Sequence, residues 1–154
     1  MDSSALIYAW GYAYPLEAFG GFWENLEGLG REGRLLVSEE VLEEVQRKDD
    51  GLHKWLKQRD SLVASHTGEV QLAVKEILKS HRLLLNAGTG KSGGDPFVVA
   101  VARVHGCCVV SEEQVSDSPK RIKIPNVCRD YRVKCIPLVR MILAEGWRFG
   151  GQGT

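Results

Sequence analysis

The sequence lacks the features of membrane, secreted and zinc-stabilised proteins. No apolar run approaches the length of a membrane span, so no membrane partner is expected. Asp2 follows Met1 directly, without the basic and apolar stretches of a secretory signal, which predicts a cytoplasmic protein. Neither a Cys-x-x-Cys pair nor a Cys/His quartet occurs, which argues against structural zinc. Cys107 and Cys108 stand in an apolar run, where we expect buried free thiols.

A complete phosphate-binding P-loop is also absent. Gly90-Lys91-Ser92 matches the end of that motif, but the motif requires a glycine five residues before Gly90, where Leu85 stands. Gly93 and Gly94 then interrupt the position at which the helix of a P-loop would continue. We therefore reject nucleotide binding by this route.

The sequence has no net charge, but its charges are unevenly distributed. Residues 1–50 hold 11 acids and 4 bases, whereas residues 114–154 hold 3 acids and 8 bases. A basic surface beside clustered acids suits a metal-dependent enzyme that acts on phosphodiesters. A solvated surface of mixed charge explains the same distribution.

The 154 residues suffice for one domain with a substantial core. We expect that domain over residues 1–149 and a disordered, glycine-rich tail over residues 150–154. Helical patterns alternate with short, wholly apolar strand candidates, which predicts an α/β fold with a parallel sheet covered by helices on both faces.

Helices and strands are expected at positions that hydrophobic periodicity and capping residues mark. Helices are predicted over residues 2–10, 16–33, 39–47, 52–59, 69–81, 96–105, 126–131 and 139–145. Strands are predicted over residues 35–37, 107–110 and 133–138, and residues 61–67 are expected to be irregular or a brief strand. A turn is predicted over residues 48–51, and loops over residues 86–94 and 114–123. The aromatic side chains of residues 8, 10, 12 and 14 are expected to pack in the core and in loops rather than to form a stacking platform. His53, His66 and His81 are expected to be surface or loop residues.

Asp95 stands at the start of an apolar helix and has two explanations. Asp is a preferred N-cap and Pro96 suits the first helical turn, so Asp95 is explained as a cap. An acid at the edge of a core also needs a partner, and a metal ion is one candidate. The sequence around Asp95 alone favours capping.

Three further acids occupy comparable positions: Asp2, Glu44 and Glu113. Each stands at the end of an expected element or on a helix face that can meet the others at one edge of a sheet. Clustered carboxylates repel one another unless a cation is present, and Mg²⁺ or Mn²⁺ is the natural occupant. From spacing alone, this arrangement is one among many.

The segments around these acids resemble the four motifs of PIN-domain ribonucleases, which include the VapC-type toxins. Residues 2–7 are similar to the opening motif, residues 41–45 to the second, residues 95–102 to the third and residues 109–113 to the fourth. More closely, the chain resembles an uncharacterised PIN-like family. That resemblance rests on Lys48 to Asp50, Ser92 to Phe97, Lys123 to Cys128 and Glu145 to Phe149.

The resemblance implies a three-layer PIN-like fold, with two departures. The family's first strand precedes the opening Asp, whereas this sequence begins at Met1. We therefore expect a short parallel sheet that lacks this strand, with unpaired neighbours and a loosely held Asp2, unless another segment fills the gap. Glu113 replaces the family's usual Asp, and Glu112 is a weaker substitute.

The resemblance also implies metal-dependent RNA hydrolysis. Asp2, Glu44 and Asp95 would bind one or two Mg²⁺ or Mn²⁺ ions, and Glu113 would complete or support the shell. Ser4 and Ser111 are expected to orient the carboxylates. The basic residues that would contact the RNA backbone are Lys120, Arg121 and Lys123. A solvated loop explains these three residues equally well.

The expected function is therefore that of a ribonuclease toxin restrained by a protein antitoxin. The resemblance also implies a homodimer, because members of the family commonly dimerise. The alternative is a catalytically inactive PIN-like module that binds RNA or a protein. The absent first strand and the replacement at Glu113 favour that alternative.

Overall fold

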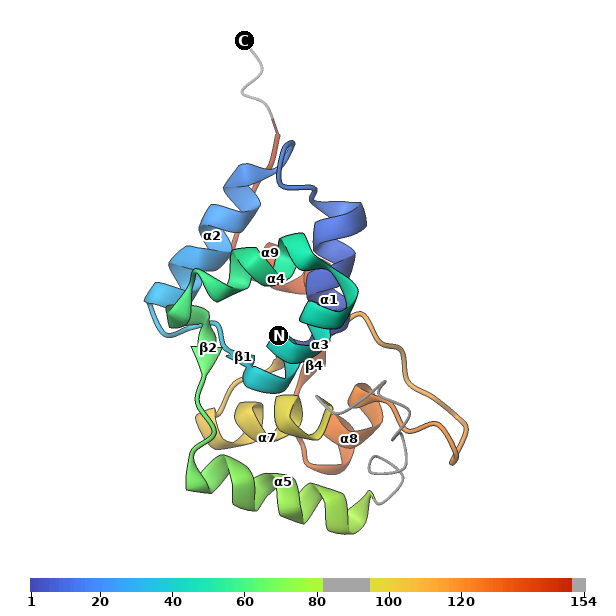
Figure 1. Cartoon of the computed structure of the whole chain (residues 1–154). Coiled ribbons are helices and arrows are strands. Elements are labelled where there is room, and N and C mark those ends of the chain that lie inside the picture. Colours follow the sequence, from blue (N-terminus) through green and yellow to red (C-terminus); the bar gives the residue numbers. More distant parts are fainter. Residues whose placement is uncertain (82–94, 151–154) are drawn as a thin grey trace.

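The computed structural model describes residues 1–81 and 95–150, apart from the side chain of Asp95, and it has an α/β architecture (Figure 1). The helices are α1 (Ser3–Tyr8), the π-helix η1 (Ala9–Ala13), α2 (Gly20–Arg31), α3 (Glu39–Lys48), α4 (Asp50–Lys57), the 3₁₀ helix η2 (Asp60–Leu62), α5 (Gly68–Ser80), α7 (Asp95–His105), α8 (Ile124–Asp130) and α9 (Leu138–Ala144). The strands are β1 (Val37–Ser38), β2 (Val63–Ala64), β3 (Val109–Val110) and β4 (Cys135–Ile136). The loop predicted over residues 86–94 and nearly all of the predicted tail lie outside the described residues.

The strands pair in parallel, as predicted, but not in one continuous sheet. In the described part of the chain, β1 pairs with β2 and β3 pairs with β4, so that two separate two-stranded sheets form. Each strand spans only two residues, fewer than the sequence pattern predicts. The prediction of a single sheet is therefore wrong, although the α/β class is confirmed.

Met1 and Asp2 lie between the two sheets. The amino group of Met1 donates a 2.7 Å hydrogen bond to the carbonyl of Leu36, immediately before β1. The backbone N–H of Asp2 donates a 3.0 Å hydrogen bond to the carbonyl of Val110 in β3. These two residues therefore link the sheets, and the expectation of a loosely held Asp2 is wrong.

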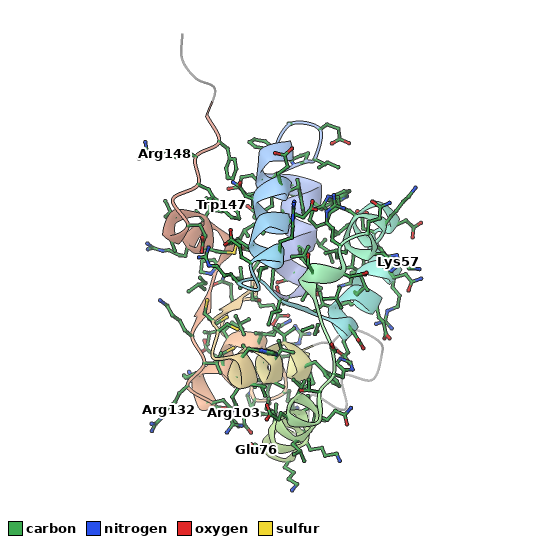
Figure 2. The ribbon with its side chains drawn as sticks, turned by 90° about the vertical axis from the view of Figure 1, so that its left-hand side faces the viewer. Lys57, Glu76, Arg103, Arg132, Trp147 and Arg148 are labelled. Atoms are coloured by element: carbon green, nitrogen blue, oxygen red, sulfur yellow. The ribbon has the colours of Figure 1, made fainter. Side chains whose placement is uncertain are left out.

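Aromatic side chains form the core between α2 and the C-terminal segment. Phe22 and Trp23 of α2 are almost completely buried and pack edge to face on each other. Trp147 packs edge to face on Phe22, with ring centroids 5.9 Å apart, and Figure 2 shows it beside the upper helices. This contact holds the segment after α9 against the domain.

The helices at the opposite end are joined by an ion pair. Arg103 of α7 contacts Glu76 of α5 at 2.7 Å, and Figure 2 shows both side chains at the lower end of the molecule. The two helices also bury Val70, Ile77 and Val99 in the core. Hydrophobic packing therefore joins α5 to α7, and the exposed ion pair adds little to it.

Capping side chains explain several helix boundaries. Ser38 caps α3 through a 3.4 Å hydrogen bond from the N–H of Val41, as its position in the sequence predicts. Asp49 caps α4 through a 2.9 Å bond from the N–H of Leu52, so α4 begins within the predicted turn. The break predicted over residues 48–51 is therefore present but is confined to Asp49, because Asp49 satisfies an amide that would otherwise lack a partner and α4 begins directly after it.

Three side chains differ from the expectations for burial. Cys107 and Cys108 are exposed, because β3 begins only at Val109 and the preceding residues lie on the surface. His81 follows the end of α5, outside any helix or strand, but it is buried and contacts Asp130 at 3.3 Å, so of its two predicted positions, surface or loop, the surface one is wrong. Among the described residues, no helix combines the length and the apolar character needed to cross a membrane.

Candidate functional site

Asp2 occupies a buried position at the carboxyl end of β3. Its side chain caps α1 by accepting a 3.0 Å hydrogen bond from the N–H of Ala5. Its own N–H binds Val110, the last residue of β3. Only 2% of Asp2 is exposed, so its carboxylate is almost completely removed from bulk water.

Two serines from distant parts of the chain donate hydrogen bonds to this carboxylate. The hydroxyl of Ser4 lies 2.9 Å from Oδ1 and 2.8 Å from Oδ2 of Asp2. The hydroxyl of Ser111, the residue that follows β3, donates to Oδ2 at 2.8 Å. The structure therefore places Ser4 and Ser111 where they fix the orientation of the Asp2 carboxylate.

The backbone after Ser111 completes this arrangement, called here the Asp2 network. The N–H of Glu112 donates to Ser4 Oγ at 3.0 Å, and the N–H of Glu113 donates to Ser111 Oγ at 3.1 Å. Each serine hydroxyl thus accepts one bond from the backbone and donates toward Asp2. The geometry joins the start of α1 to the end of β3 and leaves the carboxylate with neutral donors only.

Burial raises the pKa of Asp2 above its ordinary value, because desolvation disfavours the charged carboxylate. The bonds from Ala5, Ser4 and Ser111 and the charge of the Met1 ammonium oppose this shift but do not cancel it. No Lys, Arg or His side chain in the described residues pairs with Asp2. A bound cation would supply the positive charge that this carboxylate lacks.

Glu44 lies next to this network on α3. Its Oε2 accepts a 2.8 Å hydrogen bond from Ser3, the residue between Asp2 and Ser4. Its Oε1 accepts a 2.7 Å hydrogen bond from the ammonium of Lys48, one helical turn further along α3. Glu44 is 6% exposed. The structure therefore buries two of the predicted acids, Asp2 and Glu44, and the residue next to Asp2 in the sequence binds Glu44.

Asp95 is the first residue of α7, and its side chain lies outside the described part of the molecule. Two residues further on, Phe97 stacks on His66, with ring centroids 4.8 Å apart. His66 Nε2 in turn lies 2.7 Å from Glu40, which precedes Glu44 by one turn of α3. The first turn of α7 therefore lies near α3, on the side that carries Glu40.

The contact between His66 and Glu40 was not predicted from the sequence. His66 also approaches Glu39, with Nδ1 at 3.3 Å from Oε2, so both ring nitrogens face carboxylates. Burial raises the pKa of Glu40 above its ordinary value. His66 stands just after an apolar pair and just before a helix cap. This position is the only feature of the sequence that indicates that His66 lies at the end of a strand.

Glu113 and Glu112 use their carboxylates to hold helix starts. Glu113 Oε2 accepts a 2.9 Å hydrogen bond from the N–H of Ile124, at the first residue of α8. Glu112 Oε1 accepts a 2.7 Å bond from the N–H of Leu138, at the first residue of α9. Each carboxylate also lies favourably in the dipole of its helix. The bonds of Glu113 thus direct its carboxylate toward α8.

The three basic residues predicted to bind RNA lie at the end of the loop that follows the Asp2 network. Lys120 and Arg121 are exposed, whereas Lys123 is partly buried at the start of α8. The ammonium of Lys123 lies 3.6 Å from Glu113 Oε1. Lys120 and Arg121 therefore present their charge to solvent, while Lys123 shares its charge with Glu113.

The described side chains do not by themselves form a cluster of three or more His, Cys, Asp or Glu residues with metal-binding geometry. Asp2 and Glu44 provide two carboxylates, and the Asp95 side chain lies outside the described part of the molecule. Carboxylate and hydroxyl oxygens are the donors that Mg²⁺ and Mn²⁺ prefer. The donors that are present therefore fit such an ion in their chemistry.

The fold and the site together define an α/β domain with buried carboxylates at the carboxyl ends of its strands. The chain belongs to the family DUF4411, described as a domain of unknown function, whose model matches residues 1–149. No curated protein and no solved structure matches the chain.

Proposed function

We propose that this protein is a divalent-metal-dependent ribonuclease with a PIN-like fold, and that it is the toxin of a toxin–antitoxin pair. The observation that carries the proposal is the position of Asp2 and Glu44. These buried carboxylates are joined through the consecutive residues Ser3 and Ser4, although 41 positions separate Ser3 from Glu44. The resemblance of four segments to PIN-domain motifs supports the same activity.

The chain's own residues hold the carboxylates in place. Ser4 and Ser111 orient Asp2, and Ser3 orients Glu44. Asp2, Glu44 and Asp95 would hold the ion, and Glu113 supports the site through its backbone bond to Ser111. A divalent ion bound there polarises a phosphate and lowers the pKa of water.

RNA would reach this site along the loop between Ser111 and Ile124. Lys120 and Arg121 carry exposed positive charge on that loop and would contact the phosphodiester backbone. A protein antitoxin would restrain the enzyme by covering this approach.

The test compares two neighbouring glutamates of α3. Glu44→Gln removes the charge of a buried candidate ligand, whereas Glu43→Gln removes the charge of an exposed residue on the same helix. We expect Mn²⁺ to bind the wild type and Glu43→Gln in calorimetry, and both to cleave fluorescent single-stranded RNA. Glu44→Gln should lose Mn²⁺ binding and cleavage together. Wild-type protein that neither binds Mn²⁺ nor cleaves RNA would overturn the proposal.

A second candidate function is the inactive RNA- or protein-binding module. The observation that favours it is that both oxygens of Asp2 already accept hydrogen bonds, from Ala5, Ser4 and Ser111. RNA binding that is unchanged by Mn²⁺, EDTA and Glu44→Gln, without cleavage, would support the module and reject the enzyme.

A further inference from the structure

Two tyrosines on α1 and η1 expose their side chains instead of packing in the core. Tyr8 is 45% exposed and Tyr12 is 78% exposed. Trp10 and Tyr14, which alternate with them in the sequence, pack inward on Trp23 and Phe22. The expectation of packing in the core and in loops is therefore confirmed for Trp10 and Tyr14 and wrong for Tyr8 and Tyr12.

The two exposed rings are aligned with each other. Their centroids lie 6.4 Å apart and their planes differ by 21°. Tyr8 ends α1 and Tyr12 lies in the π-helix η1, whose wider turn changes the direction of successive side chains. Two nearly parallel aromatic faces in solvent are the geometry that stacks successive nucleic acid bases.

This pair of rings continues the row of residues that begins at the Asp2 network. Ser4 and Tyr8 are four residues apart on α1 and therefore lie on one side of it, and the ring of Tyr8 faces that of Tyr12 in η1. Ser4 is the residue that donates to both oxygens of Asp2. The distance along the helix from Ser4 to Tyr12 is roughly 12 Å, which a few nucleotides of a single strand can cross.

Positive charge lies near the other end of this row. The Lys48 side chain is 49% exposed, although its ammonium shares its charge with Glu44. The loop that carries Lys120 and Arg121 departs from Ser4, where the N–H of Glu112 binds the serine hydroxyl. In Figure 1 α1 and this loop lie on the same side of the molecule, and the loop extends downward from the lower end of α1.

We propose that Tyr8 and Tyr12 form a base-stacking site for single-stranded RNA, next to the Asp2 network. The inference rests on the proposed function, in which RNA is the ligand. It identifies Tyr8 and Tyr12 as the residues that select single-stranded over duplex RNA. Bases in a duplex are already stacked on one another, so only unpaired bases are free to cover the two rings. The site is tolerant of sequence, because every base has an aromatic face.

The experiment measures binding in EDTA, so that cleavage plays no part in it. Fluorescence anisotropy follows a fluorescein-labelled oligoadenylate RNA and an oligomer of the same length with abasic riboses. We expect Tyr8→Ala and Tyr12→Ala each to weaken oligoadenylate binding about tenfold and to leave abasic binding unchanged. Tyr8→Phe and Tyr12→Phe should bind like the wild type, because the aromatic face remains.

Leu72→Ala is the matched control, because Leu72 exposes an apolar side chain on α5, away from α1. It should bind both oligomers like the wild type, and thermal melts should show that every variant is folded. Alanine variants that bind oligoadenylate as tightly as the wild type would overturn the inference. Alanine variants that lose oligoadenylate binding and abasic binding equally would also overturn it. The same holds if these variants bind RNA normally but lose self-association or antitoxin binding.

The two proposals fail in different ways. Tyrosine-dependent oligoadenylate binding in a protein that does not cleave RNA with Mn²⁺ would reject the nuclease and keep the stacking site. Metal-dependent cleavage that is unchanged in Tyr8→Ala and Tyr12→Ala, together with unchanged binding, would keep the nuclease and reject the stacking site.

Discussion

Ser111 donates a 2.8 Å hydrogen bond to Asp2 across 109 positions of the chain. Ser111 follows β3, and Asp2 precedes α1, so the bond joins the end of a strand to the start of a helix. The same hydroxyl accepts a bond from the N–H of Glu113, which fixes the direction in which it donates. The position of the Asp2 carboxylate therefore depends on the backbone that follows β3.

Ser111→Ala should destabilise the protein. The substitution removes a donor to a buried carboxylate and leaves the N–H of Glu113 without its acceptor, and we expect a loss of about 1–3 kcal/mol in the free energy of unfolding. Urea denaturation followed by tryptophan fluorescence measures this loss. Ser80→Ala, at an exposed helix end, should change the stability little; an equal effect of both substitutions would show that the bond to Asp2 contributes nothing.

Asp2→Asn should stabilise the protein increasingly as the pH rises. The folded state raises the pKa of Asp2 above the ordinary value of 3.8, so the folded protein favours the protonated acid. The stability that this preference contributes is present below about pH 4 and is lost as the pH rises through the folded pKa. Asn keeps the capping role without a charge.

Thermal melts of the wild type and Asp2→Asn without metal, from about pH 4 to about pH 8, test the direction in which their stability difference changes with pH. The difference in Tm should grow with pH in favour of the variant. Added Mn²⁺ should then raise the Tm of the wild type alone. A variant that is less stable by the same amount at every pH would show that Asp2 acts only as a helix cap.

Two glycines of α2 should respond to alanine in opposite directions. A Cβ at Gly30 would overlap the side chain of Leu62, whereas a Cβ at Gly28 would meet nothing within 4 Å. Gly30→Ala should therefore cost about 1–3 kcal/mol through overpacking. Gly28→Ala should stabilise the helix by about 0.5–1 kcal/mol, because alanine loses less conformational freedom. Chemical denaturation of both variants measures the difference, and equal signs would contradict the packing of α2 on Leu62.

The sequence predicted the helices better than the sheet. Apolar periodicity and caps such as Ser38 are local signals, and α3, α5 and α7 lie close to the expected residues. The strands are shorter than their apolar runs, because pairing depends on neighbours that are distant in the sequence. Cys107 and Cys108 show the consequence, since they belong to an apolar run but lie on the surface before β3.

The candidate site was predictable in part. Asp2 was selected from its position at an element end, Glu44 from its position on a helix face, and both from the resemblance. The structure buries both, and Ser3, next to Asp2, binds Glu44. The carboxylate of Glu113 instead binds the first N–H of α8, a tertiary contact that spacing in the sequence does not reveal. The exposure of Tyr8 and Tyr12 was missed because an aromatic-rich segment does not indicate which of its rings face the core.

Removing two exposed charges should weaken RNA binding without affecting stability. Lys120 and Arg121 lie in solvent on the loop after Glu113, and no ion pair joins either side chain to a described acid. Each phosphate contact in single-stranded nucleic acid contributes about 0.7 to the slope of log affinity against log salt, so Lys120→Ala with Arg121→Ala should reduce that slope by about 1.4. Anisotropy titrations in EDTA at several salt concentrations measure the slope. Lys123→Ala is the comparison for this slope, because Lys123 lies 3.6 Å from Glu113 at the start of α8 and shares its charge with that residue. An equal slope in the double variant and the wild type would exclude this loop from the RNA path.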